Sequence, residues 1–400
     1  MDAASVRDDC LTMNERIVAW RRDLHRIPEI GIELPDTENY VRQRLAEFGV
    51  PLQAGYDGTG VVALVEGTAG RGPVLAVRAD MDALEIEEAT GAEYSSTRPG
   101  RMHACGHDAH TAIALGAAEY LIRHRDKLAG TVKFIFQPGE ECMDGARRMI
   151  EAGALENPRV EAVIGLHIGG IWNELGTGQV GVSDRAVMAA ADAFNFSMKA
   201  VGSHGAYPHQ SADPVLAASA AVVQLHTLVG RSIRPTAAAV VTVGRIEGGQ
   251  ARNIIPTEVA ARGTVRTLDQ AVRDHLRGRI GEVIAGVAAA HGCSHSYEFF
   301  PGAPAVIGDS VICGRVRDAA VEILGRDDVV EITEPSLGGE DVSLFMERAP
   351  GCFFGLGGSN PAEGIHSIHH NPEFRIDESV LWRGAAVFSL CALRRLAPSG

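Results

Sequence analysis

The stretch that decides the fold is TVKFIFQPGEE, residues 131–141. Its first six residues are rich in β-branched and aromatic side chains, which is the composition of a buried β-strand. A Pro-Gly turn and two adjacent glutamates, Glu140 and Glu141, follow directly. The stretch therefore predicts a buried strand that carries two carboxylates at its end.

Short apolar runs and helical patterns alternate on both sides of this strand. The predicted strands are residues 61–65, 74–77, 131–136, 162–166 and 352–356, and the predicted helices lie within residues 14–48 and at 111–124, 146–152 and 378–396. Alternation of this kind is typical of helices packed around a mostly parallel sheet. We therefore expect residues 1–189 and 301–400 to form the two parts of one α/β domain.

The pattern changes between these two parts. The elements predicted there are an alternating strand at 194–198, an Ala-rich helix at 214–228, strands at 238–243 and 258–265, and a helix at 270–290. This order suits a small α+β domain with an antiparallel sheet. We expect it to occupy residues 190–300, inserted into the α/β domain.

Composition narrows the class of protein. The chain has 400 residues, 46% of them hydrophobic and 22% charged, which is enough for two globular domains. Its net charge of −14 argues against nucleic acid or an anionic membrane as a partner. The first twenty residues carry acids where a signal peptide has a basic segment, and the seven cysteines show no repeated spacing. We therefore expect a cytoplasmic protein in which Cys105 is free to bind a metal.

Metal-binding residue types are concentrated in MHACGHDAH, residues 102–110, which holds one thiol, three imidazoles and a carboxylate. Thiolate and imidazole are ligands that zinc-like ions prefer, although a lone Cys-x-His pair is a weak signal. Further candidates follow predicted strands: Asp80, Asp82, Glu140, Glu141, His167 and the pair His369-His370. Because open α/β sheets bind ligands at the carboxyl ends of their strands, this combination predicts a metal centre there.

Seven motifs resemble, in order and spacing, those of the M20 metallopeptidases. They are RADMDAL (78–84), HACGHDAHTA (103–112), QPGEE (137–141), GLH (165–167), SHGAYPH (203–209), ARNIIPTEV (251–259) and HHNPEF (369–374). The resemblance is strongest to the aminoacylase-like amidohydrolases, which include hippurate hydrolases and enzymes that hydrolyse auxin–amino acid conjugates. It runs from about Arg21 to the predicted C-terminal helix.

The resemblance implies a centre of two divalent metal ions per subunit. Its ligands would be Cys105, His107, Glu141, His167 and His370, with Glu140 as the catalytic carboxylate and Asp82 orienting a ligand. Manganese or zinc is expected, and cobalt or nickel also suits these ligands. His370 is preferred to His369 because His-x-Pro is the family pattern, and His103, His110, His366 and His369 are expected in loops or behind the ligands. The role of Asp80 stays open. Asp108 is expected to cap a helix or, as an alternative, to lie behind the ligands as a partner of one of them, and the acidic turn at residues 338–341 is expected to cap a helix.

The inserted domain resembles the lid of the same family, which usually also pairs two subunits. The resemblance implies that His204 reaches toward the carbonyl oxyanion and that Asn253 and Arg266 reach toward the polar end of the substrate. It also implies a homodimer or a higher homo-oligomer. The chain departs from the family at Glu85, at residues 142–144 and at residues 230–235, and these departures put the identity of the substrate in doubt.

The sequence therefore predicts a metal-dependent hydrolase that cleaves a C–N bond. The expected substrate is a small molecule, most simply an N-acyl amino acid, whose amide is attacked by a water with Glu140 as general base. One alternative is another C–N bond, as in an aryl amine or a dipeptide. A second alternative is a catalytically silent metal-binding scaffold, which would not need a free carboxylate such as Glu140 beside its ligands.

Overall fold

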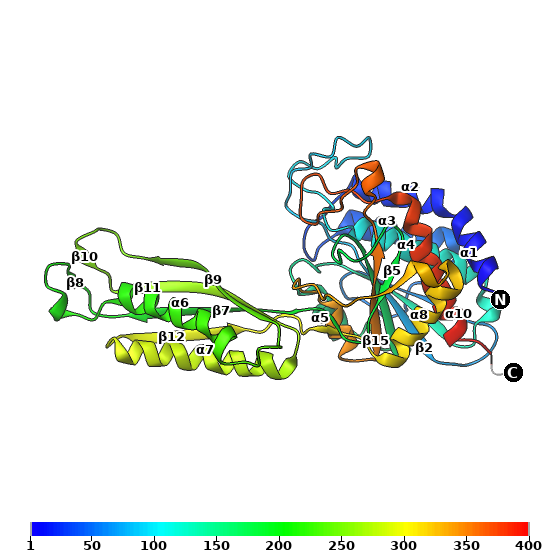
Figure 1. Ribbon diagram of the computed structural model, residues 1–400. Coiled ribbons are helices and arrows are strands. Elements are labelled where there is room, and N and C mark those ends of the chain that lie inside the picture. Colours follow the sequence, from blue (N-terminus) through cyan, green and yellow to red (C-terminus); the bar gives the residue numbers. More distant parts are fainter. Residues whose placement is uncertain (1, 399–400) are drawn as a thin grey trace. The chain divides into compact units, whose positions relative to one another are not determined.

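In a computed structural model that describes residues 2–398, seven strands form the central sheet in the order β1-β3-β2-β4-β15-β5-β14. The strands are β1 (Val61–Glu66), β2 (Val74–Asp80), β3 (Thr131–Gln137), β4 (Ala162–Gly169), β5 (Val180–Val182), β14 (Val329–Glu331) and β15 (Gly351–Gly357). Four of the six neighbouring pairs are parallel, and β1 with β3 and β15 with β5 are antiparallel. The prediction of a mostly parallel sheet is confirmed (Figure 1).

The register of the central strands brings their carboxyl ends to one edge. β2 lies between β3 and β4, and Val77 pairs with Phe134 on one side and with Ile164 on the other. Asp80 at the end of β2 pairs with Gln137 at the end of β3. The residues that follow these strands therefore start from neighbouring points, as parallel pairing requires.

Helices cover both faces of this sheet. They are α1 (Ala3–Thr12), α2 (Asn14–His25), α3 (Pro35–Phe48), α4 (His107–Arg123), α5 (Gly145–Glu151), α8 (Ser310–Leu324), α9 (Val342–Met346) and α10 (Leu381–Arg395). One core joins α4 and α10 to the inward residues of β2 such as Val77, and a second core joins α5 and α9 to residues of the opposite face such as Ala76. Helix α4 is almost wholly buried, so its residues are held firmly in place.

The chain divides into two compact units. The first unit comprises Met1–Val187, Val306–Ser336 and Asp341–Gly400, and the second comprises Met188–Ala305 and Leu337–Glu340. Short elements complete the fold: β6 (Ala186–Met188), β13 (Val306–Ile307) and 3-10 turns at Arg125–Lys127, Pro208–Gln210, Arg326–Asp328, Pro361–Glu363 and Glu378–Val380. Among residues 2–398, no helix has both the length and the apolar composition needed to cross a bilayer.

The second unit is an α+β layer with an antiparallel sheet. Its strands β7 (Ala190–Lys199), β9 (Ala239–Gly248), β11 (Glu258–Thr267) and β12 (Ser294–Phe300) lie in the order β12-β7-β11-β9. Alternate residues of β11 are buried, because α6 (Pro214–Arg231) and α7 (Gln270–Ala290) pack on one face only. A separate pair of short strands, β8 (Ser203–His204) and β10 (Ile254–Ile255), carries part of the predicted site.

Candidate metal centre

A glycine turn presents the first two predicted ligands. Helix α4 begins at His107, directly after Gly106, which adopts the left-handed conformation with φ of +87°. A side chain there would be strained, and its Cβ would lie 3.0 Å from Cγ2 of Ile168. The glycine therefore lets the chain turn sharply into α4 between Cys105 and His107, close against β4.

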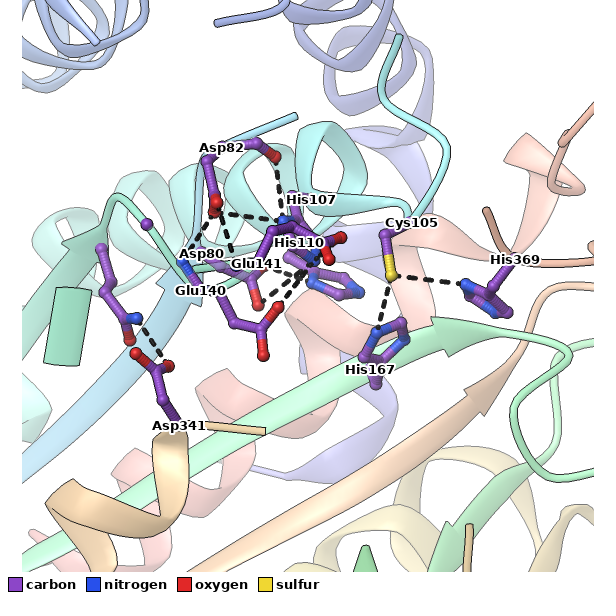
Figure 2. Close-up of polar contacts among 12 residues, drawn as sticks. Asp80, Asp82, Cys105, His107, His110, Glu140, Glu141, His167, Asp341 and His369 are labelled. Atoms are coloured by element: carbon purple, nitrogen blue, oxygen red, sulfur yellow. Dashed lines mark hydrogen bonds and ion pairs between the residues drawn. The ribbon is translucent and has the colours of Figure 1, made fainter. Parts of the chain in front are cut away.

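The five predicted ligands lie in one cluster. Their potential ligand atoms form overlapping groups, each within 4.8 Å: Cys105 with His107 and His167, Cys105 with Glu141 and His370, and His107 with Glu140 and Glu141. Cys105 Sγ lies 3.6 Å from Nε2 of His167, and His370 Nε2 lies 3.4 Å from Oε1 of Glu141. Figure 2 shows Cys105 between His167 and His369, with the glutamates beside His107.

The histidine tautomers leave lone pairs directed at this cluster. His107 donates from Nδ1 to the backbone carbonyl of Asp82 at 2.9 Å, and His167 donates from Nδ1 to the carbonyl of Ile168 at 2.9 Å. In the neutral form of each ring, which is the form that binds a metal, Nε2 is then the acceptor nitrogen. His107 Nε2 and Glu141 Oε1 are buried and have no hydrogen-bond partner among the described residues. Buried acceptors without partners, beside a thiol, fit a bound transition-metal cation.

The electrostatics of the cluster favour added positive charge. Burial would lower the pKa of His107, but the nearby carboxylates, Asp80 first among them, raise it well above its usual value. Burial lowers the pKa of His167 and so keeps its imidazole in the neutral, metal-binding form. Burial also raises the pKa of the Cys105 thiol to about 12. A cation bound here would therefore displace a proton from the thiol.

Asp82 holds the turn that carries the two glutamates. Its carboxylate accepts from the backbone N–H groups of Glu140 and Glu141, each at 3.0 Å, and it lies 3.4 Å from Nδ1 of His107. Asp82 is 1% exposed, so water does not compete for these contacts. The structure thus places Asp82 behind the cluster, in contact with both glutamates and one histidine.

Both His369 and His370 contact residues of the cluster, although the sequence assigns only His370 to the metal. His370 has a φ of +56° and a largely exposed side chain that reaches Glu141. His369 is more buried, its Nδ1 lies 3.6 Å from Cys105 Sγ, and its Nε2 accepts from the N–H of Gly170 at 3.1 Å. Both histidines therefore reach the cluster from the same loop.

Asp108 does not cap helix α4, and the prediction that it does is wrong. Gly106 occupies the N-cap position, and the Asp108 side chain turns away into the core. Its Oδ2 forms an ion pair with Nε of Arg21 at 2.7 Å and accepts from Nδ1 of His25 at 2.8 Å. The wholly buried Arg21 needs a counterion, and this need outweighs the capping preference of an aspartate.

Asp341 occupies the N-cap position of α9, but its side chain does not cap the helix. It precedes α9 but makes no capping hydrogen bond, and instead accepts from Arg78 at 3.1 Å, from Gln137 at 2.7 Å and from the N–H of Ala146 at 3.0 Å. Arg78 also donates to Asp80 at 2.7 Å. Sequence reasoning missed this network, although a charged Arg78 inside the otherwise apolar strand VLAVRAD was a signal for it.

The predicted substrate-binding residues all lie in the second unit. His204 and Asn253 line one pocket of about 650 Å³, where the N–H of Ala206 donates to Nδ1 of His204 at 3.0 Å. Arg266 does not line this pocket. It lies on β11 and donates to the carbonyls of Val265 at 3.1 Å and Asp192 at 3.5 Å. The structure therefore brings two of these three residues together.

Comparison with known proteins supports the resemblance drawn from the motifs. Residues 76–394 match the family described as Peptidase family M20/M25/M40. The chain is 39% identical over 388 residues to N-acetyl-L-cysteine deacetylase of Bacillus subtilis, covering 97% of this chain and 90% of that protein. It is 38% identical to IAA-amino acid hydrolase ILR1-like 4 of Arabidopsis thaliana, covering 95% and 86%.

A solved structure shows the same fold. The YXEP protein of Bacillus subtilis, described as a dinuclear metal binding peptidase from the M20 family, superposes with a TM-score of 0.82 at 34% identity. The match covers 96% of this chain and 99% of that one. With matching motifs, a matching fold and relatives of this identity over nearly its whole length, the chain is a member of peptidase family M20/M25/M40.

Proposed function

We propose that this protein is a metal-dependent amidohydrolase that cleaves the amide bond of N-acyl amino acids. The observation that carries the proposal is a buried carboxylate, Glu140, beside a cluster of thiol, imidazole and carboxylate ligands at the ends of parallel strands. The names of the two relatives, a deacetylase of N-acetyl-L-cysteine and a hydrolase of IAA-amino acid, point to the same reaction class.

The cluster would hold two divalent ions through Cys105, His107, Glu141, His167 and His370. When bound, such ions supply Lewis acidity toward the amide carbonyl and toward the attacking water. Manganese or zinc is our first choice, and cobalt or nickel would also suit a mixed sulfur, nitrogen and oxygen donor set. The described dinuclear centre of the YXEP protein supports the number of ions.

Glu140 is our candidate for general base. It is 5% exposed, and its Oε2 lies 3.9 Å from Nε2 of His107 while its backbone N–H is held by Asp82. A carboxylate so placed would take a proton from the attacking water and pass it to the departing amine nitrogen. Glu141, which contacts His370, is assigned to metal binding instead.

The second unit is proposed to act as a lid and to pair two subunits. On this proposal residues 1–189 and 301–400 form the catalytic domain and residues 190–300 form the insert. The edge strand β9 has one side free of strand partners among the described residues, and Ile246 on it is 49% exposed. Val223 on α6 is 65% exposed. An open strand edge with apolar neighbours favours a homodimer.

His204, Asn253 and Arg266 would then contact the substrate, with His204 stabilising the oxyanion and the other two binding the polar end. The proposed dimer allows a test of whether the site is shared, in which two inactive variants are mixed. Inactive His204→Ala subunits combined with inactive Glu140→Gln subunits should recover part of the activity if the site is shared. If mixtures that are shown to exchange subunits recover no activity, the site is not shared between subunits.

The cytoplasmic location expected from the cysteine usage stays a prediction.

The test of the proposed function compares Glu140→Gln with its neighbour, Glu141→Gln. Glu140→Gln should keep its bound metal while turnover falls on the order of 10²-fold or more. Glu141→Gln should lose metal, because one ligand is removed. Metal content is measured by elemental analysis after dialysis, and turnover by amine release from a panel of N-acyl amino acids, dipeptides and aryl amines. Equal metal loss in both variants would reject this division of roles.

The same panel separates the alternatives. Activity only on the aryl amines or dipeptides of the panel would keep the mechanism but change the substrate class. A protein that binds two metal equivalents and releases no amine from any substrate would support the silent scaffold. Wild-type protein that binds no divalent metal would reject the metal centre.

A further inference from the structure

His110 packs against two of the proposed metal ligands, His107 and His167, without being one of them. It is 1% exposed and lies three residues after His107, so both point from the same side of α4. Its ring centroid is 5.5 Å from that of His107 and 4.6 Å from that of His167. The rings of His107 and His167 are themselves 6.2 Å apart, so the three rings form one packed triangle between α4 and β4, and Figure 2 shows His107 and His110 above His167.

Both nitrogens of His110 are engaged. Nδ1 lies 2.5 Å from Oδ1 of Asp80, and Nε2 accepts from the backbone N–H of Ile168 at 2.9 Å. A ring nitrogen that accepts from an amide carries no proton, so His110 is the neutral tautomer that donates from Nδ1. Neither nitrogen is left for a cation in this arrangement. The ring instead ties helix α4 to strand β4 beside His167.

A buried network fixes Asp80, the partner of His110. Arg78 donates to Asp80 Oδ2 at 2.7 Å, and the hydroxyl of Thr111 donates to the Asp80 backbone carbonyl at 2.7 Å. Arg78 is itself held by Gln137 at 2.7 Å. These contacts join β2, β3 and α4 below the cluster. A partner held this firmly leaves the His110 ring little freedom to rotate.

We infer that His110 is a positioning residue: its ring, which Asp80 orients, accepts from the N–H of Ile168, and this bridge from α4 to β4 sets the separation between His107 and His167. The inference deepens the proposed metal centre and rests on it. Without the bridge, α4 and β4 keep only packing contacts at this point, and the two ligands lose their fixed distance. Partners that orient metal ligands typically account for about 10- to 100-fold in metal affinity.

Two amide substitutions separate the bridge to Ile168 from the contact with Asp80. The amide of His110→Asn lies near the place of Nδ1, so this variant keeps a donor for Asp80 and loses the acceptor for Ile168. The amide of His110→Gln reaches near the place of Nε2, so this variant keeps the acceptor and loses the donor. A matched control is His124→Asn, which removes a half-buried histidine at the other end of α4, bonded to the Tyr120 carbonyl at 2.9 Å.

The readout is titration of the metal-free proteins with Co²⁺, followed by visible absorption, which reports the ligand geometry independently of turnover. Wild type and His124→Asn should bind two equivalents with the same spectrum. His110→Asn should bind one or both equivalents about 10- to 100-fold more weakly and with a changed spectrum. His110→Gln should recover most of the wild-type affinity. Urea unfolding of each metal-free variant provides the measure of general stability.

Several results would overturn the inference. Affinity and spectrum of His110→Asn within about threefold of wild type would show that the bridge does not set the ligand distance. Equal weakening in His110→Asn and His110→Gln, or failure of both to fold, would assign His110 a general structural role. Wild type that binds no Co²⁺ would instead reject the proposed metal centre, and with it this inference, so the two failures are distinguishable.

Discussion

Replacing Asp108 with asparagine should destabilise the first unit far more than the loss of one surface charge would. Asp108 and Arg21 are both 0% exposed at their side chains and lie 2.7 Å apart, and His25 adds a contact of 2.8 Å to the same oxygen. Removing one partner of a buried ion pair costs about 3–5 kcal/mol, because the other charge stays buried. The amide of the variant still accepts a hydrogen bond, so we expect about 3 kcal/mol.

The matched control is Asp144→Asn, because Asp144 also pairs with arginines at the start of a helix but is partly exposed. That change should cost no more than about 1 kcal/mol. The assay is urea unfolding followed by tryptophan fluorescence, since all three tryptophans, Trp20, Trp172 and Trp382, lie in the first unit. Equal losses in the two variants would refute the argument from burial.

The same pair has a defined pH dependence. Burial would raise the pKa of Asp108, but Arg21 and His25 hold it well below its usual value. A carboxyl whose folded pKa is depressed contributes stability that is present above its unfolded pKa of about 4 and is lost as the pH falls below it. The difference in stability between wild type and Asp108→Asn should therefore shrink below about pH 4. A constant difference from pH 7 to pH 3 would contradict the assignment.

The remaining predictions concern a ligand, a buried lysine and a substrate contact. Cys105→Ser should lower the metal content, and metal loading should protect the wild-type thiol from oxidants; a metal-replete, active variant would make the cysteine a packing residue. Burial lowers the pKa of Lys133 to about 8, so the folded state binds fewer protons than the unfolded state between about pH 8 and 10.5. As the pH rises through that window, the unfolding free energy of wild type should increase by at most about 3 kcal/mol relative to that of Lys133→Met. Parallel plots of unfolding free energy against pH for the two proteins would disprove this. Wild type should prefer substrates with a free carboxylate to their amides, and Arg266→Ala should erase the preference in kcat/KM while leaving metal content unchanged.

Elements with their own periodic pattern were predictable from the sequence. Strands β2, β3 and β4 are mostly apolar runs, and the carboxylates or imidazole that the site uses lie in the last residues of each strand or directly after it. The sequence shows this directly, because a strand and the residue after it are neighbours along the chain. Strands β5 and β14, with three residues each, were missed because such short segments have no period to detect.

Contacts between distant segments were not predictable. Arg78 and Asp341 are 263 positions apart, and Cys105 and His369 are 264 positions apart. No pattern along the sequence marks such distant partners. The sequence neighbours of Asp108 and Asp341 suggest instead that each caps a helix. The demand of a buried arginine for a counterion is a property of the folded core, and it decided the roles of Asp108 and Asp341.

The pairing of β4 with β15 has a consequence for synthesis of the chain. β4 ends at Gly169 and its parallel neighbour β15 begins at Gly351, with the whole second unit between them. At about 5–20 residues per second, a ribosome needs on the order of 10 to 40 s to make the intervening segment. During that time β4 has no permanent neighbour on one side, and the second unit is made and completed only near the end of the interval. The nascent chain should therefore depend on chaperones during this interval, and faster elongation after residue 169 should raise the yield of folded protein.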